Sequence, residues 1–148
     1  MNRPFHRLDY TQHQPEVYQA LLTASQLIHQ GPLPPSLTEL LSLRVSQLNG
    51  CAFCLDMHAS ALRASGVEPR KLDTLAGWRD SRFFGPGERA ALAWADALTA
   101  LPLTTSSAPQ YQALGEHFDP SRITALTLVI ALINAWNRLG VGLQPTLP

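Results

Sequence analysis

The chain has 148 residues with 11 basic and 11 acidic side chains, so its formal net charge is zero and only 15% of its residues are charged. This length predicts one domain, spanning residues 1–148, with a hydrophobic core of its own. The balanced charge excludes the basic stripe that a nucleic-acid backbone requires, so we expect no nucleic-acid partner. A hydrophobic content of 45% with so few charges predicts that the chain associates with copies of itself.

The sequence shows no segment typical of a signal peptide or of a membrane span. The first ten residues carry charges and contain no apolar run of signal-peptide length. The longest uncharged apolar stretch, residues 123–137, would rise only about 22 Å as a helix, against a hydrocarbon core of roughly 30 Å. We therefore expect a cytoplasmic protein without a membrane partner.

Apolar residues recur at three- and four-residue spacing along nearly the whole chain, and the alternation typical of strands is missing. Prolines favour helix starts and glycines favour helix ends, and together they mark the boundaries. An all-α fold follows, and the last two of its helices are so apolar that we expect them to supply subunit contacts. The predicted helical segments run from Pro15 up to Gly31 and from Ser36 up to Gly50, and over residues 51–66, 71–78, 88–101 and 119–140.

Two cysteines stand close together at the start of the predicted helix over residues 51–66. Cys54 lies in the first turn, where free backbone N–H groups and the helix dipole favour a thiolate. His58 follows four residues later, so its side chain lies on the same helix face as Cys54. This spacing predicts that Cys54 is a nucleophile that exchanges protons with His58. Cys51 can close a disulfide onto an oxidised Cys54 without movement of the backbone.

Glu39, on the preceding predicted helix, is a fourth candidate. If the two helices form an antiparallel hairpin, Glu39 lies only about 3–5 Å from the level of His58 along the helix axis. Glu39, His58 and Cys54 would then form a proton path. An alternative stays open at this point, because Ser36 and Glu39 fit a capping box, in which the carboxylate would bind the backbone at the helix start.

The motif C-x-x-C-x-x-x-H at residues 51–58, together with residues 43–51 and 88–94, resembles the alkyl hydroperoxidase D (AhpD-like) family of the carboxymuconolactone decarboxylase superfamily. The resemblance implies an all-helical fold in which a helix-turn-helix hairpin carries the motif. It also implies that Cys54 is the peroxide-reactive cysteine and Cys51 its disulfide partner, and that His58 and Glu39 relay protons.

The resemblance further implies a thiol-dependent peroxidase or disulfide reductase that serves as an antioxidant oxidoreductase. Its substrate would be a small peroxide, and its electron donor a dithiol of lipoyl type, thioredoxin type or a peroxiredoxin partner. Family members commonly form trimers or hexamers, and no cofactor or metal is implied. One position departs from the family, because Phe53 stands where a well-studied member has a histidine. The peroxidase rate of that member is therefore not carried over to this chain.

Two other interpretations of the cysteine pair stay open. In the first, the chain is a redox-responsive oligomeric scaffold or binding protein, in which oxidation of the pair changes assembly without catalytic turnover. In the second, Cys51, Cys54 and His58 are ligands of a structural zinc ion. A structural zinc site needs a fourth ligand and usually draws on a second cysteine pair, which this sequence lacks.

Overall fold

The computed structural model describes residues 6–103 and 107–147, and in these residues the chain forms helices without a β-strand. The predicted all-α fold is therefore confirmed. The elements in chain order are α1 (Tyr10–His13), α2 (Pro15–His29), α3 (Pro35–Asn49), α4 (Ala52–Ala64), α5 (Pro69–Asp73), a short 3₁₀ helix η1 (Leu75–Gly77), α6 (Pro86–Thr99), α7 (Ala108–Leu114) and α8 (Pro120–Leu143).

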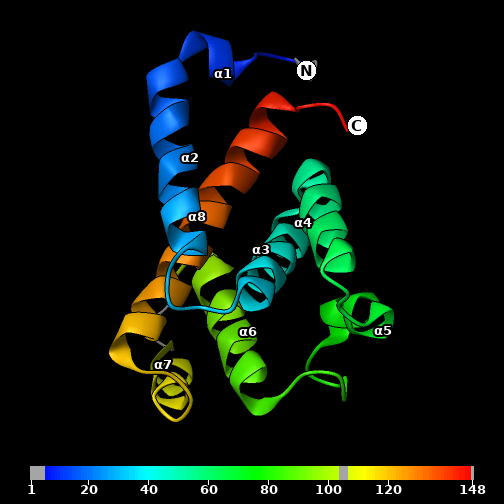
Figure 1. Ribbon diagram of the computed structural model, residues 1–148, viewed down its shortest axis with the longest axis vertical. Helices are drawn as coiled ribbons and strands as arrows, with labels where there is room; N and C mark the ends of the chain where they lie inside the picture. Colours follow the sequence, from blue (N-terminus) through cyan, green and yellow to red (C-terminus); the bar gives the residue numbers. More distant parts are fainter. Residues whose placement is uncertain (1–5, 104–106, 148) are drawn as a thin grey trace.

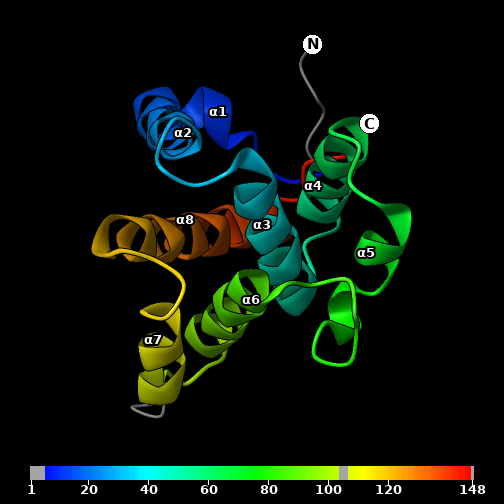
Figure 2. The ribbon, with the colours of Figure 1, turned by 60° about the horizontal axis from the view of Figure 1, so that its bottom comes forward.

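Helix α3 lies at the centre of the fold. It packs against α4, α6 and α8, as Figure 2 shows, and most of its residues between Leu37 and Ser46 are buried. Burial of such apolar side chains is the main force that holds helices of this length in place. Its position makes α3 the support on which the elements of the site are arranged. The largest fully buried apolar side chains of the core are Leu40, Leu41, Leu62, Leu75, Leu92, Leu114, Leu126 and Ile130.

Helix α8 crosses the molecule and contacts α2, α3, α4 and α6 (Figure 1). Among the described residues it is the one helix that is long and apolar enough to span a membrane by length and composition. In this structure Leu126, Ile130 and Ile133 pack into the core. Its apolar character is therefore explained in part by its place in the helical bundle.

Helices α1 and α2 form an arm along one side of α8 (Figure 1). No residue of α2 is buried, so this helix covers the bundle rather than forming part of its core. The Trp136 indole N–H donates a hydrogen bond to the Ser25 hydroxyl at 2.9 Å, and the Tyr18 ring meets the Trp136 ring edge-on. These contacts fasten α2 to α8.

The predicted helices are confirmed, with shifts at their ends. Helix α6 begins at Pro86 rather than at residue 88, because proline suits the first helical position and the Glu88 carboxylate accepts a hydrogen bond from the Gly85 N–H at 3.0 Å. Helix α8 continues to Leu143, past the predicted end at residue 140. The segment predicted over 71–78 divides into α5 and η1. The apolar run of α6 is buried within the chain itself.

Candidate active site

The turn between α3 and α4 places both cysteines at the start of α4. Gly50 ends α3 with φ 66° and ψ 34°, in the left-handed region that glycine adopts without strain. The N–H groups of Gly50 and Cys51 both bind the Ser46 carbonyl, which closes the turn. The predicted helix-turn-helix hairpin that carries the cysteine motif is therefore confirmed.

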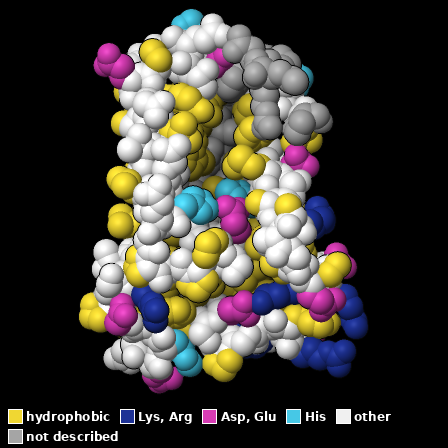
Figure 3. Space-filling model, viewed as in Figure 1, with side chains coloured by type: hydrophobic (Ala, Val, Ile, Leu, Met, Phe, Trp, Pro, Cys, Tyr) yellow, Lys and Arg dark blue, Asp and Glu magenta, His cyan; other side chains and the backbone are white. Residues whose placement is uncertain are grey.

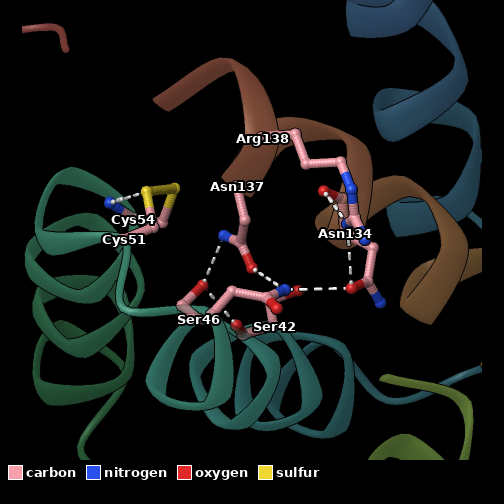
Figure 4. Close-up of a disulfide and its surroundings, with 8 residues drawn as sticks. Ser42, Ser46, Cys51, Cys54, Asn134, Asn137 and Arg138 are labelled. Carbon is pink, nitrogen blue, oxygen red and sulfur yellow. Dashed lines mark hydrogen bonds between the residues drawn. A yellow bond between two sulfur atoms is a disulfide. The ribbon is translucent and has the colours of Figure 1, made fainter. Parts of the chain in front are cut away.

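Cys51 is the N-cap of α4, and its Sγ accepts a hydrogen bond from the Cys54 N–H at 3.3 Å. The two sulfurs are joined in a disulfide, and both residues are buried. Figure 4 shows this bond at the start of α4, facing α8. In this oxidised form neither sulfur is available as a metal ligand. The described residues contain no group of three or more His, Cys, Asp or Glu that could hold a metal ion.

A cavity of about 570 Å³ opens beside the disulfide, and Cys54 lines it whereas Cys51 does not. Figure 3 shows a hollow in the upper half of the molecule. Apolar side chains form its walls, and histidine and acidic side chains lie at its lower edge. The cavity is therefore apolar along most of its walls and ionisable near Cys54. Its apolar lining comes from α2, α4 and α8 and includes Leu22, Ile28, Phe53, Met57, Val129, Leu132, Ile133 and Trp136.

The structure brings Glu39 and His58 together across the hairpin. The Nδ1 atom of His58 lies 2.7 Å from Oε2 of Glu39, and both residues line the same cavity as Cys54. The other carboxylate oxygen, Oε1, lies 3.4 Å from Nε2 of His29 at the end of α2. Cys54 is buried, and side-chain exposure rises outwards from 10% for His58 to 19% for Glu39 and 41% for His29.

The capping interpretation of Glu39 is wrong. Helix α3 starts at Pro35, one residue before Ser36. Its N-cap is Pro34, and no side-chain hydrogen bond caps the helix there. The Glu39 carboxylate points to the two histidines instead of back to the helix start. Proline at the first helical position removes one backbone N–H that a cap would have to satisfy, so α3 begins without the capping box.

One ring nitrogen of His58 has a hydrogen-bond partner and the other has none. Nδ1 is close to Glu39, while Nε2 is buried and has no hydrogen-bond partner. A buried imidazole nitrogen without a partner is costly, of the order of 1–3 kcal/mol, so its position calls for a function or a transient partner. If Nδ1 carries the proton that Glu39 accepts, Nε2 holds a free lone pair and can accept a proton.

Behind the disulfide, a chain of buried polar groups joins α3 to α8 (Figure 4). The Asn137 amide donates to the Ser46 hydroxyl at 3.0 Å, and the Ser46 hydroxyl donates to the Ser42 carbonyl at 2.7 Å. The Asn49 amide donates to the side-chain oxygens of Asn137 and Asn134. These bonds fix α8 against the turn that carries the cysteines.

Sequence reasoning missed His29 and Gly140. His29 lies on a different helix from the motif, but the short proline-rich connection of residues 30–34 was a signal that the end of α2 lies near the start of α3. Gly140 lies so close to the disulfide that a Cβ atom there would stand 2.6 Å from Cys51 Sγ. No local pattern marks that contact, because it joins residues far apart in the chain.

Comparison with known proteins identifies the family of the chain. The sequence model of the carboxymuconolactone decarboxylase family matches residues 15–97. The uncharacterised protein YdfG of Bacillus subtilis is 33% identical over 137 residues, which make up 93% of each chain. The alkyl hydroperoxide reductase AhpD of Bradyrhizobium diazoefficiens is 50% identical over 36 residues, which make up 24% of this chain and 20% of that protein.

A solved structure is similar over almost the whole length. It is the crystal structure of a protein of unknown function from Agrobacterium tumefaciens, whose name links it to the antioxidant defence protein AhpD. It superposes with a TM-score of 0.92 at 33% identity, covering 96% of this chain and 97% of the other. The fold therefore belongs to a known structural type.

Proposed function

Since the chain belongs to the carboxymuconolactone decarboxylase family and is AhpD-like, we propose that it is a thiol-dependent peroxidase or disulfide reductase of AhpD type. One observation carries the proposal: Cys54, one half of a redox pair, borders a large apolar cavity that the His58–Glu39 pair also borders. A reactive sulfur, a proton acceptor and room for a substrate are what thiol-based peroxide reduction requires.

In the proposed reaction, reduced Cys54 gives its proton to Nε2 of His58, and the thiolate attacks one oxygen of the peroxide. The S–O bond forms as the O–O bond breaks, so the sulfur is oxidised to a sulfenic acid and the peroxide is reduced to an alkoxide, which takes the proton from His58. The Cys51 sulfur then attacks the Cys54 sulfur, and the hydroxyl leaves as water with the Cys51 proton. A dithiol donor reduces the disulfide and is itself oxidised.

The surroundings of the two cysteines support this division of roles. Cys54 borders the cavity and lies one helical turn from His58, as an attacking sulfur must. Cys51 does not border the cavity, and its sulfur lies close to Gly140 of α8. A sulfur that no substrate reaches is suited to resolving the sulfenic acid on its neighbour.

The cavity supports an organic peroxide as substrate and a slender dithiol as donor. A volume of about 570 Å³ is typical of sites that hold a small organic molecule, and far exceeds what hydrogen peroxide needs. Phe53, which replaces the histidine of a well-studied family member, adds to its apolar wall. Because the disulfide is buried, a flexible lipoyl arm reaches it more easily than the surface of a thioredoxin or peroxiredoxin does.

We also propose that the protein works as a homo-oligomer, a trimer or hexamer, in the cytoplasm. Disulfides in a reducing cytoplasm are usually transient and catalytic, which agrees with a redox role for the pair. Self-association is supported by large apolar side chains that are exposed on α2 and α8. These are Val17, Leu27, Leu128 and Val141.

The test follows peroxide consumption by the reduced protein with dihydrolipoamide as donor and cumene hydroperoxide as substrate. We expect Cys54→Ser to abolish turnover, because the attacking sulfur is gone. We expect Cys51→Ser to stop after one equivalent and to accumulate a sulfenic acid on Cys54, which a dimedone adduct identifies by mass spectrometry. Ser60→Ala, an exposed substitution on the same helix that lies outside the cavity lining, is the matched control and should keep the wild-type rate.

Turnover by Cys54→Ser at the wild-type rate would overturn the proposal. Loss of two thiols per chain with one equivalent of peroxide, but without turnover, would favour the redox-responsive scaffold, particularly if oxidation changed the oligomeric state. Thiols that resist alkylation and a bound zinc ion in the same sample would favour the zinc module. Metal analysis on the same preparation separates these outcomes.

A further inference from the structure

The Glu39 carboxylate lies between two imidazoles rather than one. Oε2 is 2.7 Å from Nδ1 of His58, and Oε1 is 3.4 Å from Nε2 of His29. A carboxylate has lone pairs on both oxygens, so it can hold both contacts at once and pass a proton between them. The proposed reaction uses only the His58 side, and nothing in it so far employs His29.

The two imidazoles differ in their surroundings. His58 is buried on α4, whereas His29 is the last residue of α2 and almost half of its side chain is exposed to water. Water reaches His29 directly, whereas Nε2 of His58 is inaccessible to it. The line from Cys54 through His58 and Glu39 to His29 therefore leads from buried atoms beside the cavity to solvent.

We propose that His29 is the solvent-side member of the proton relay, an inference that rests on the proposed function. When Cys54 becomes a thiolate, its proton passes to Nε2 of His58, the Nδ1 proton of His58 passes to Glu39, and Glu39 passes a proton to His29, which releases one to water. The alkoxide later receives a proton along the same line in reverse. His29 does not touch the reacting atoms and acts through Glu39, so it is a positioning residue.

This role makes the relay depend on α2. Helix α2 contributes no buried residue and packs along α8, and its last residue, His29, contacts Glu39. The same helix supplies part of the cavity wall, so the position that encloses a substrate also completes the proton path. The other ionisable side chains that line the cavity lie on α1, its N-cap and α2. They are Asp9, Tyr10 and Tyr18.

The test uses His29→Ala and His29→Gln, with His13→Ala as the matched control, because His13 is also an exposed histidine in the last turn of a helix. In a Cys51→Ser background, the rate of Cys54 alkylation by iodoacetamide reports proton loss from the thiol without any turnover. We expect both His29 variants to slow this alkylation and peroxide consumption by about tenfold or more between pH 6 and pH 8. Free imidazole should restore the rate of His29→Ala, since the site is open to water.

Wild-type rates in both His29 variants would overturn the inference, and so would a loss that free imidazole does not restore, because that loss would mark a merely structural tie to α2. The His13 control should keep wild-type rates throughout. Failure of the peroxidase proposal is recognised separately, because Cys54→Ser then retains peroxide turnover whereas the alkylation readout still reports on His29.

Discussion

Single residues decide how closely the redox pair packs against the rest of the fold. An ideal Cβ on Gly140 would lie 2.6 Å from Cys51 Sγ and 3.4 Å from Cys54 Sγ. The first distance is shorter than carbon and sulfur tolerate, and the neighbour is a disulfide within a helix start rather than the end of a flexible side chain. Gly140 is therefore needed for close approach.

We expect Gly140→Ala to weaken the oxidised form selectively. The new methyl group would press on Cys51 Sγ. We therefore expect the equilibrium constant for reduction of the disulfide by glutathione to rise by about tenfold, which corresponds to about 30 mV for a two-electron couple. Gly142→Ala is the control. Gly142 lies in the same helix as Gly140, but a Cβ there meets no atom within 4 Å. Alanine favours helix over glycine by about 0.5–1 kcal/mol, so the control should be at least as stable as the wild type. Alkylation of thiols after equilibration measures the effect, and equal midpoints in both variants would contradict it.

The sequence predicted the site residues that lie close together along the chain. The spacing of Cys54 and His58 along one helix and the hairpin geometry of Glu39 follow from helix dimensions alone. In the structure Glu39 contacts His58, and both line the same cavity as Cys54. The contact of His29 with Glu39 and that of Gly140 with the disulfide depend on how α2 and α8 pack. Such packing is a property of the whole core, which a single sequence does not reveal.

Between elements, the most specific junction is the one that joins α8 to α3 behind the disulfide. Asn137 is buried, donates to the Ser46 hydroxyl and accepts from the Asn49 amide, each at 3.0 Å. Buried amides that are fully hydrogen-bonded fix the register of two helices more firmly than apolar contacts, because an unpaired group is costly. This register holds Gly140, one turn further along α8, against the cysteines.

We expect Asn137→Ala to lower the free energy of unfolding by about 1–3 kcal/mol, because Ser46 and Asn49 each lose a buried partner. The measurement is urea unfolding of the oxidised protein, so that the disulfide is constant. Thr124→Ala, an exposed substitution in the same helix, should stay within about 0.5 kcal/mol of the wild type. A change of similar size in both variants would mean that the amide bonds do not fix the junction.

The long helices were predictable, and two of the short ones were not. The helices that became α2, α3, α4, α6 and α8 show several turns of apolar periodicity between proline and glycine boundaries. Helices α1 (Tyr10–His13) and α7 (Ala108–Leu114) are too short for periodicity to show, and tertiary contacts hold them: α1 packs on α2 and α7 on α6. Local pattern therefore predicts an element only when it extends over enough turns.

Across the whole molecule, Asp96 of α6 is the point at which three parts of the chain meet. Its carboxylate accepts hydrogen bonds from Arg44 of α3 at 2.7 and 3.0 Å, from the Trp78 indole at 3.2 Å and from Arg79 at 2.8 Å. Burial alone would raise the pKa of Asp96, but the bonds and charge of Arg44, followed by the bonds of Arg79 and Trp78, outweigh burial and lower it. The carboxylate is thus more easily ionised in the folded chain than in the unfolded chain.

Because the folded pKa of Asp96 is lowered, this group contributes stability above its unfolded pKa of about 3.9 and loses that contribution as the pH falls through the folded value. We expect Asp96→Asn to be less stable than the wild type by about 2–3 kcal/mol near neutral pH, since charged hydrogen bonds are lost and Arg44 is left buried. The difference should shrink below about pH 4 as the wild-type carboxyl becomes protonated. Urea midpoints between pH 7 and pH 3 measure it. Asp80 is exposed, so Asp80→Asn is the control and should have almost the same free energy of unfolding as the wild type at every pH. If the stability difference between Asp96→Asn and the wild type stayed constant down to pH 3, the charge of Asp96 would not be what joins these three parts.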